Sequence, residues 1–336
     1  VVGTGSFLWN HFINPDPVSA ELKQMVTDSK TSTFSVKKWE EADRYSKKAI
    51  KFKEKDELMS SGNEFAVTGV KLKAPYGIAC FPEGILLADH GESCLYLIDY
   101  SGNLVRKIGE LGNGPNQFQK PTGCTYHNGY YYVIDSGNKR IVILDRQFNY
   151  TKELKLPKSE REPEKEFTDI AINDKGDIYI SGSYLYDSGL YRYNLGKEKF
   201  ENVQKYFYGS LKEFNGEVYA VDQFRIYVDF EKKEITGGAG PNALWRLDGR
   251  NIKKLSNLPA GLNAGSFELL RDNLIICSPF HSAVMVFNMK NGKYMSNIYE
   301  VDKMDYKTYA SIYGSDLYIT EPEKGKILKI SLEKLQ

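Results

Sequence analysis

Residues 109–156, GELGNGPNQFQKPTGCTYHNGYYYVIDSGNKRIVILDRQFNYTKELKL, contain short apolar runs separated by turn sequences, and this pattern decides the fold. HNG at 127–129 has the form of a tight hairpin turn, because Asn-Gly tolerates the positive φ that such turns need. Residues 130–134 are aromatic and β-branched, which favours a strand. DSGN at 135–138 is a second turn, and residues 140–144 alternate as a third strand would. The stretch predicts one sheet of short antiparallel strands.

A single sheet of this size cannot bury both of its faces, so it needs neighbours like itself. Similar units follow residue 63 with onsets about 40–56 residues apart, which is near the range of propeller repeats. They are expected at residues 76–109, 109–156, 167–207, 209–222 with 243–256, 264–301 and from 308 onward. The last unit is one strand short, whereas residues 65–72 form a predicted strand without an earlier partner. We expect that strand to complete the last sheet, since ring closure removes exposed sheet edges.

The same stretch resembles a known family. GNGPNQFQKPTGC followed by YYYVIDSGNKRIVILD is similar to an NHL repeat, whose pattern is G-x-G-x-G-x-F, then P-x-G, then a strand ending V-x-D, then N-x-R-I. The matching positions are Gly112, Gly114, Phe118, Pro121, Gly123, Val133, Asp135, Asn138, Arg140 and Ile141. The resemblance implies a β-propeller, usually six-bladed in this family. The expected fold is all-β, a six-bladed propeller over residues 63–336.

Residues 1–62 do not follow the propeller pattern and predict an α-helical N-terminal extension. Asp16 and Pro17 suit a helix start that continues to about residue 30. A second helix is expected at 35–59, with an apolar face and a face of lysine and glutamate. It is either an amphipathic helix for a partner or a membrane surface, or a helix packed on the propeller with a solvated face. Acidic residues among the lysines favour the second interpretation.

Bulk composition narrows the functional classes. With 45 basic and 44 acidic residues the net charge is +1, which exerts no global attraction on nucleic acid or anionic membrane. No apolar run approaches the roughly 18 residues of a membrane span. The lysine-, tyrosine- and asparagine-rich composition and a start without methionine predict an extracytoplasmic or secreted protein, with a cytoplasmic one left open. We expect a monomer.

All four cysteines lie inside predicted strands, and none forms a close metal-type pair. Buried free thiols are the favoured interpretation, because free cysteine is among the most buried residue types. A disulfide between Cys80 and Cys94 is the main alternative.

Candidate binding residues lie on the propeller face that carries the loops between second and third strands. Asp89, Asp135, Asp222 and Glu321 occupy equivalent loop positions. Short acidic side chains commonly cap turns and bond backbone groups, and this is the favoured interpretation. The sharper one is a ring of carboxylates able to hold Ca²⁺, the one cofactor that the sequence suggests.

Other residues of this face are aromatic or polar. Aromatic side chains just before the first strands suit a sugar, a peptide or an apolar small molecule. The candidate ligand-binding residues are Tyr76, Asp89, His90, Asp135, Asn138, Arg140, Tyr208, Asp222, Arg225, His281, Tyr309 and Glu321. Residues 223–242 are inserted into the fourth unit, where they predict a small hairpin that sets access to the central channel.

These observations favour a binding or scaffold protein that recognises a protein, peptide or glycan on the loop face. The alternative is a metal-assisted hydrolase or lyase at the channel mouth, for which six-bladed lactonases and amidating lyases are precedents in fold alone. A zinc lyase needs several convergent histidines, and only His90 and His281 are expected near the mouth. Nucleic acid is not expected as a partner, because acidic residues share the loops with the basic ones.

Overall fold

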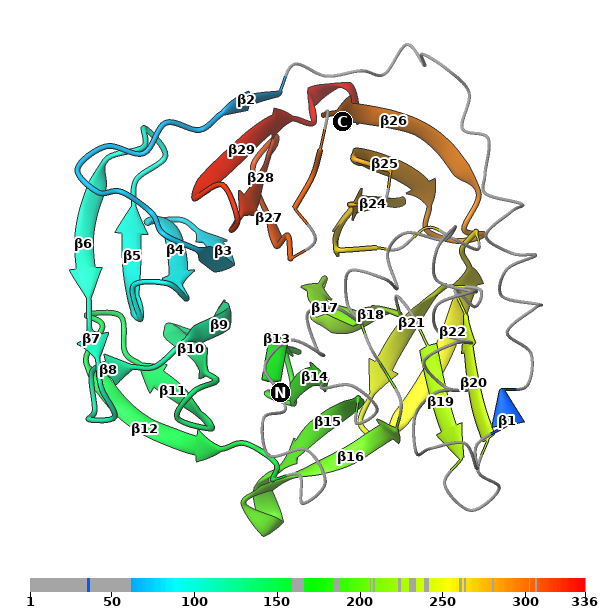
Figure 1. Cartoon of the computed structure of the whole chain (residues 1–336), viewed down its shortest axis with the longest axis horizontal. Coiled ribbons are helices and arrows are strands. Elements are labelled where there is room, and N and C mark those ends of the chain that lie inside the picture. The colour runs from blue at the N-terminus through cyan, green and yellow to red at the C-terminus, as the bar shows by residue number, and fades with distance from the viewer. Residues whose placement is uncertain are drawn as a thin grey trace.

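A computed structural model of the chain describes residues 62–158, 166–183, 188–205, 207, 209–222, 242–259, 262, 264–279, 281–301, 303–305 and 307–335, and the backbone of three strands elsewhere. Its central feature is a ring of six four-stranded antiparallel sheets (Figure 1). The innermost strand of each sheet lies near the axis of the ring. The prediction of a six-bladed β-propeller is therefore confirmed.

The first three blades follow the chain in order from the inside outward. Blade one holds β3 (Pro75–Phe81), β4 (Gly84–Asp89), β5 (Cys94–Ile98) and β6 (Leu104–Ile108). Blade two holds β9 (Pro121–His127), β10 (Tyr130–Asp135), β11 (Arg140–Leu144) and β12 (Tyr150–Lys155). Blade three holds β13 (Glu166–Ile172), β14 (Ile178–Ser183), β15 (Gly189–Asn194) and β16 (Lys199–Lys205). Short strands β7 (Glu110–Leu111) and β8 (Gln117–Phe118) pair between blades one and two.

The last three blades complete the ring. Blade four holds β17 (Gly209–Phe214), β18 (Glu217–Asp222), β21 (Ala243–Asp248) and β22 (Asn251–Asn257). Blade five holds β23 (Ser266–Leu270), β24 (Asn273–Ser278), β25 (Ala283–Asn288) and β26 (Tyr294–Glu300). Blade six holds β27 (Ala310–Tyr313), β28 (Asp316–Glu321), β29 (Lys326–Ser331) and the N-terminal strand β2 (Gly62–Glu64). Two 3-10 helices, η1 (Leu195–Lys197) and η2 (Glu333–Leu335), flank β16 and the C-terminus, and neither could cross a membrane.

Closure by an N-terminal strand is confirmed, but the strand lies earlier than predicted. β2 pairs antiparallel with β29, and after Phe65, whose N–H donates to the Ile327 carbonyl over 2.8 Å, the chain leaves the sheet. Thr68 then forms one parallel bridge with Asn103. Phe65 and Leu72 are buried in the cluster between blades six and one, which includes Tyr318. The alternation of residues 65–72 thus reflects burial across a blade junction rather than strand pairing.

The insertion in blade four forms the predicted hairpin, with β19 (Arg225–Asp229) antiparallel to β20 (Glu234–Gly238). A short strand β1 (Ser35–Val36) pairs parallel with β20 and covers its edge. The predicted helix at 35–59 is therefore wrong at its first two residues, where pairing with an open strand edge replaces helical turns. The remainder of that helix and the helix from Asp16 lie outside the described residues.

Glycines of the repeat allow the innermost strands to approach closely. A Cβ on Gly77 would lie 2.1 Å from the Thr122 carbonyl oxygen, and one on Gly123 would lie 2.6 Å from the Thr168 carbonyl oxygen. Real Cβ atoms do not make such contacts, so the P-x-G glycine is required by neighbouring backbone. The Asn-Gly hairpin is also confirmed, with φ of 48° at Asn128 and 85° at Gly129.

Side chains join neighbouring blades around the axis. The Thr122 hydroxyl donates to the Phe167 carbonyl over 2.6 Å, and the Leu211 N–H donates to Asp169 over 2.9 Å. The Cys80 N–H donates to the Ser311 hydroxyl over 3.0 Å and so connects blade one to blade six. These bonds satisfy polar groups that the innermost strands would otherwise leave unpaired near the axis.

The cysteines are all free thiols, so the structure contains no disulfide between Cys80 and Cys94. Cys94, Cys124 and Cys277 are buried, as predicted, and Cys80 is half-buried. Burial raises the pKa of Cys80, Cys124 and Cys277 to about 12, which keeps these thiols protonated and unreactive at neutral pH.

Candidate functional site

Three rings stack where innermost strands begin, on the face that carries the second-to-third-strand loops. Tyr76 near the start of β3 lies against His90, which follows β4, with ring centres 4.3 Å apart and planes within 10°. Tyr309, just before β27, stacks on Tyr76 at 6.0 Å and 26°. All three side chains are half-buried. Blades one and six thus present one group of rings. All three residues are among the candidates that were named from the sequence.

An ion pair lies beside these rings. Lys307 precedes β27 in blade six, and Glu166 begins β13 in blade three, on the opposite side of the ring (Figure 1). The Lys307 Nζ lies 3.4 Å from a Glu166 carboxylate oxygen and 5.1 Å from the centre of the Tyr76 ring. The pair therefore spans the axis. We call Tyr76, His90, Glu166, Lys307 and Tyr309 the rim cluster.

His90 experiences the charges of the rim cluster. Burial lowers its pKa, and Lys307 and Lys120 lower the pKa further, while Glu166 and a backbone hydrogen bond to Pro121 act in the opposite direction. The ring is therefore neutral at pH 7. Its Nδ1 atom is buried and has no hydrogen-bond partner among the described residues. Such an atom needs water or a ligand group, because an unpaired buried polar atom is costly.

The carboxylates of the loops have a different role. Asp89 accepts four backbone N–H groups, those of Lys73 at 2.8 Å and of Ala74, Gly91 and Glu92 at 3.0 Å each. These bonds connect the loop after β4 to the segment that leads into β3. Asp89 therefore caps turns, as the favoured interpretation predicted.

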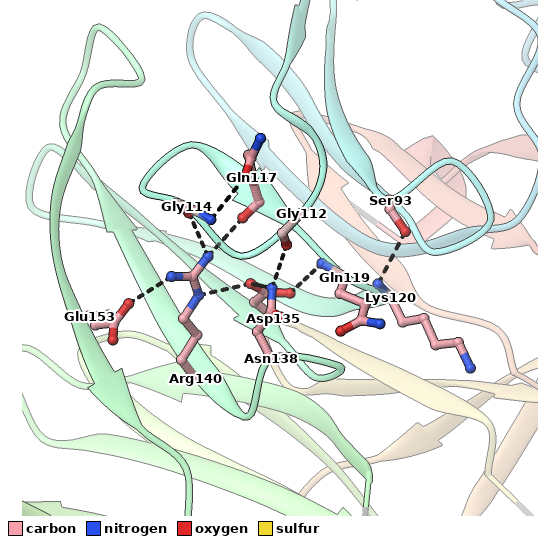
Figure 2. A network of polar contacts seen from close by, with 10 residues as sticks. All are labelled: Ser93, Gly112, Gly114, Gln117, Gln119, Lys120, Asp135, Asn138, Arg140 and Glu153. Atoms are coloured by element: carbon pink, nitrogen blue, oxygen red, sulfur yellow. Dashed lines mark hydrogen bonds and ion pairs between the residues drawn. The ribbon is translucent and has the colours of Figure 1, made fainter.

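Figure 2 shows the equivalent network in blade two. Asp135 is fully buried and accepts the Gln119 N–H at 2.6 Å, the Asn138 amide at 2.7 Å and the Arg140 Nε–H at 2.9 Å. The Arg140 guanidinium also pairs with Glu153 at 2.8 Å. It donates to the carbonyls of Gly114 and Gln117, in the segment before β9, at 2.8 Å each.

Each motif residue of this network therefore faces another part of blade two or the β7–β8 segment that precedes it. Burial raises the pKa of Asp135, whereas its hydrogen bonds and the charge of Arg140 oppose that change. Asp135, Asn138 and Arg140 were predicted as ligand-binding residues, and their polar groups are occupied by contacts within the protein.

Two further acidic candidates are also engaged. The Ala243 N–H donates to Asp222 over 2.6 Å, which anchors the chain where it returns from the insertion. Glu321 is buried and accepts the Lys324 ammonium at 2.5 Å. Among the described residues no three histidine, cysteine, aspartate or glutamate side chains are arranged to hold a metal ion. The predicted ring of carboxylates is thus four separate turn contacts, and the Ca²⁺ hypothesis gains no support from their geometry.

Three further candidates are Tyr208, Arg225 and His281. Tyr208 lies outside the described residues, and Arg225 is described only as backbone in β19. His281 is half-buried and has contacts within the protein. Lys307 and Glu166 were not among the candidates named from the sequence. Lys307 lies two residues before Tyr309 and Glu166 one residue before Phe167, and both of these positions had been considered as starts of innermost strands.

A second group of charges lies further along the innermost strands. Lys212 on β17 pairs with Glu268 on β23 at 2.9 Å and donates to the Ala310 carbonyl on β27 at 2.5 Å. Asp169 on β13 is also buried there. Burial lowers the pKa of Lys212, but Glu268 and Asp169 raise it, so the ammonium stays charged. We call Asp169, Lys212 and Glu268 the axial cluster, which connects blades three, four and five and, through the Ala310 carbonyl, blade six.

Comparison with known proteins supports the fold. Residues 69–222, from the segment before β3 to the end of β18, match a family model described as a 6-bladed beta-propeller. No curated protein matches the chain.

Several solved structures are similar. Virginiamycin B lyase from Staphylococcus aureus is 16% identical with a TM-score of 0.54, over 81% of this chain and 99% of that one. A luciferin-regenerating enzyme is 11% identical with a TM-score of 0.56, over 81% and 95%. A protein of unknown function from Bacteroides thetaiotaomicron is 12% identical with a TM-score of 0.56, over 81% and 72%. Identities this low show a shared fold and carry no activity to this chain.

Proposed function

We propose that this propeller is a binding protein that recognises a glycan, peptide or protein through the rim cluster. The observation that carries the proposal is the stack of Tyr76 between His90 and Tyr309 beside the Lys307–Glu166 pair. Ligand sites commonly combine aromatic surface with a few convergent polar groups. The rim cluster has both, from blades one, three and six, at one end of the ring axis.

The degree of burial also supports this location. Lys307 and Glu166 have side chains 40% and 37% exposed, so a ligand can reach them. Their separation of 3.4 Å is long for a charge-assisted hydrogen bond, and exchange of partners costs little. By contrast, the loop carboxylates accept hydrogen bonds from backbone N–H groups or from nearby side chains of the protein. We therefore place the ligand at the rim cluster rather than along the loops.

We also infer that the propeller is of the NHL-repeat type. The inference rests on the motif residues of blade two, where each has a structural reason. Gly123 permits close approach of β13, Asp135 anchors the segment before β9, and Arg140 holds the preceding loop.

The binding proposal is tested with labelled protein on glycan and peptide arrays. We expect Tyr76→Leu to abolish capture that the wild type shows, because the stack loses its central ring. Tyr130→Leu is the matched control, since Tyr130 is 41% exposed and begins β10 at the opposite end of the ring axis. Capture that survives Tyr76→Leu but fails in Tyr130→Leu would place the site on the other face and overturn the proposal.

A further inference from the structure

Together with Lys120, which acts electrostatically on His90, the rim cluster carries an excess of positive charge. Burial disfavours the Lys307 ammonium, but Glu166 and Tyr76 raise the pKa of Lys307, so it stays charged. Lys120 is exposed, and among the described residues it forms no ion pair. Its backbone is held at a φ of 50°, with its N–H donating to the Ser93 hydroxyl at 3.3 Å (Figure 2). Two ammonium groups against one carboxylate favour an anionic ligand group.

The backbone near the axis argues against an extended peptide. A peptide that adds to a sheet edge needs unpaired N–H and C=O groups. On the innermost strands the Cys80 N–H already donates to Ser311, and the Leu211 N–H already donates to Asp169. The groups that the rim cluster presents are all side chains, so we expect recognition there to come from side chains. Rings, ammonium groups and a carboxylate suit the C–H faces, the acidic groups and the hydroxyls of a sugar.

Building on the proposed binding function, we propose that the rim cluster binds an oligosaccharide that carries carboxylates, that is, one built from uronic acids. Lys307 turns from Glu166 to a ligand carboxylate, and Lys120 approaches the same group from blade two. Glu166 then accepts hydrogen bonds from sugar hydroxyls. Tyr309 contacts the face of a sugar ring. The ligand carboxylate replaces a partner that Lys307 already has, so the ammonium is never left unpaired.

The test is isothermal titration with a panel of short galacturonate, glucuronate, mannuronate and guluronate oligosaccharides and with their neutral methyl esters. We expect at least one acidic member to bind and its methyl ester to bind at least about tenfold more weakly, since a charge-assisted contact is lost. Lys307→Met and Lys120→Met should each weaken binding of the acidic form, Lys307→Met by about tenfold. Lys290→Met is the control, because Lys290 is 72% exposed in the turn between β25 and β26, away from the rim.

The outcomes separate this inference from the proposed function. Equal binding of acidic and methylated forms, lost in Tyr76→Leu, would leave the rim as the binding site and overturn the acidic ligand class. Absence of binding to every acidic member would overturn it too, and the array experiment with Tyr76→Leu would still decide the proposed function. Equal loss in Lys307→Met and Lys290→Met would show that general charge, not the rim, governs binding. That result would also overturn the inference.

Discussion

Two lysine–glutamate pairs lie near the axis of this propeller. They differ in the distance between the charged groups, in the exposure of the side chains and in the other partners of the lysine. Lys212 and Glu268 are 2.9 Å apart, with side chains 19% and 11% exposed, and the lysine has a further acceptor in Ala310. Lys307 and Glu166 are 3.4 Å apart and about twice as exposed or more, at 40% and 37%. The Lys212–Glu268 pair thus connects blades in the interior of the ring, whereas the Lys307–Glu166 pair lies where its partners can be exchanged.

The difference has a simple physical origin. The attraction between buried charges is strong because the dielectric constant around them is low. Removal of one partner is costly, because the other charge is then buried without a partner and without water. A half-exposed pair is screened by solvent, so each member retains nearly the same energy with another partner. The axial cluster is therefore expected to control stability, and the rim cluster is expected to control binding.

Breaking the axial pair should have the strongest effect on stability. Lys212→Met leaves Glu268 without its partner and removes the bond to Ala310, which should lower the free energy of unfolding by about 3 kcal/mol. Urea unfolding followed by tyrosine and tryptophan fluorescence measures this. The double variant Lys212→Met/Glu268→Leu should recover much of the loss, since Glu268 is then no longer left as a buried carboxylate without its partner. A loss below about 1 kcal/mol in the single variant would show that the pair is not structural.

Arg140 extends the comparison to a buried cation outside the axis. Its side chain is 8% exposed and contacts two carboxylates and two carbonyls. Arg140→Met should lower the free energy of unfolding by about 2–3 kcal/mol, because several buried acceptors lose their donor. Arg246→Met serves as control, since Arg246 is 37% exposed. If instead Arg140→Met left stability unchanged and impaired ligand binding, the role predicted from sequence alone would be correct.

The pKa of His90 reports the charges of the rim. Burial lowers this pKa in the folded state, so as the pH falls the unfolded chain takes up its proton first. Stability contributed by neutral His90 should therefore be present above about pH 6.5 and be lost as the pH falls toward the folded pKa. NMR titration should show a lower pKa for His90 than for a free histidine.

Variants of the rim pair test the same coupling. Lys307→Met should raise the pKa of His90 and Glu166→Gln should lower it further, because each removes a charge that acts on the ring. An unchanged His90 titration in both variants would contradict the proximity of the three groups.

Breaking the rim pair should have the smallest effect on stability. Lys307→Met should change the free energy of unfolding by less than about 1 kcal/mol, because both side chains are more than a third exposed and the contact is screened. The measurement is the urea midpoint, compared with that of Lys212→Met in the same buffer. Losses of similar size in the two variants would remove the distinction between the clusters.

Sequence patterns anticipated much of the fold, and the reasons are local. The Asn-Gly turn at Asn128 needs positive φ, the P-x-G glycine at Gly123 needs space beside a backbone, and period-two alternation marks the strands. Where alternation had another cause, as in residues 65–72, the predicted strand was misplaced. The first residues of the predicted second helix, Ser35 and Val36, pair instead with β20, an edge far away in sequence.

The candidate site was anticipated only in part. Tyr76 and Tyr309 could be chosen because innermost-strand starts recur at regular spacing, and His90 because it lies in a loop between second and third strands. The structure brings these three together. Nothing local distinguished Asp135 and Arg140, whose polar groups turn inward to the blade, from residues that face a ligand. Local sequence cannot show which way such a side chain turns.

Short-range patterns thus account for strands, turns and the number of blades, because each depends on residues a few positions apart. Charge pairing around the axis depends on closure of the whole ring. Lys307 and Glu166 are 141 positions apart in the chain, and Lys212 and Ala310 are 98 apart. These residues meet because the six sheets are arranged around one axis and the sixth lies next to the first. That closure buries Lys212 in its ion pair and leaves Lys307 half-exposed at the rim.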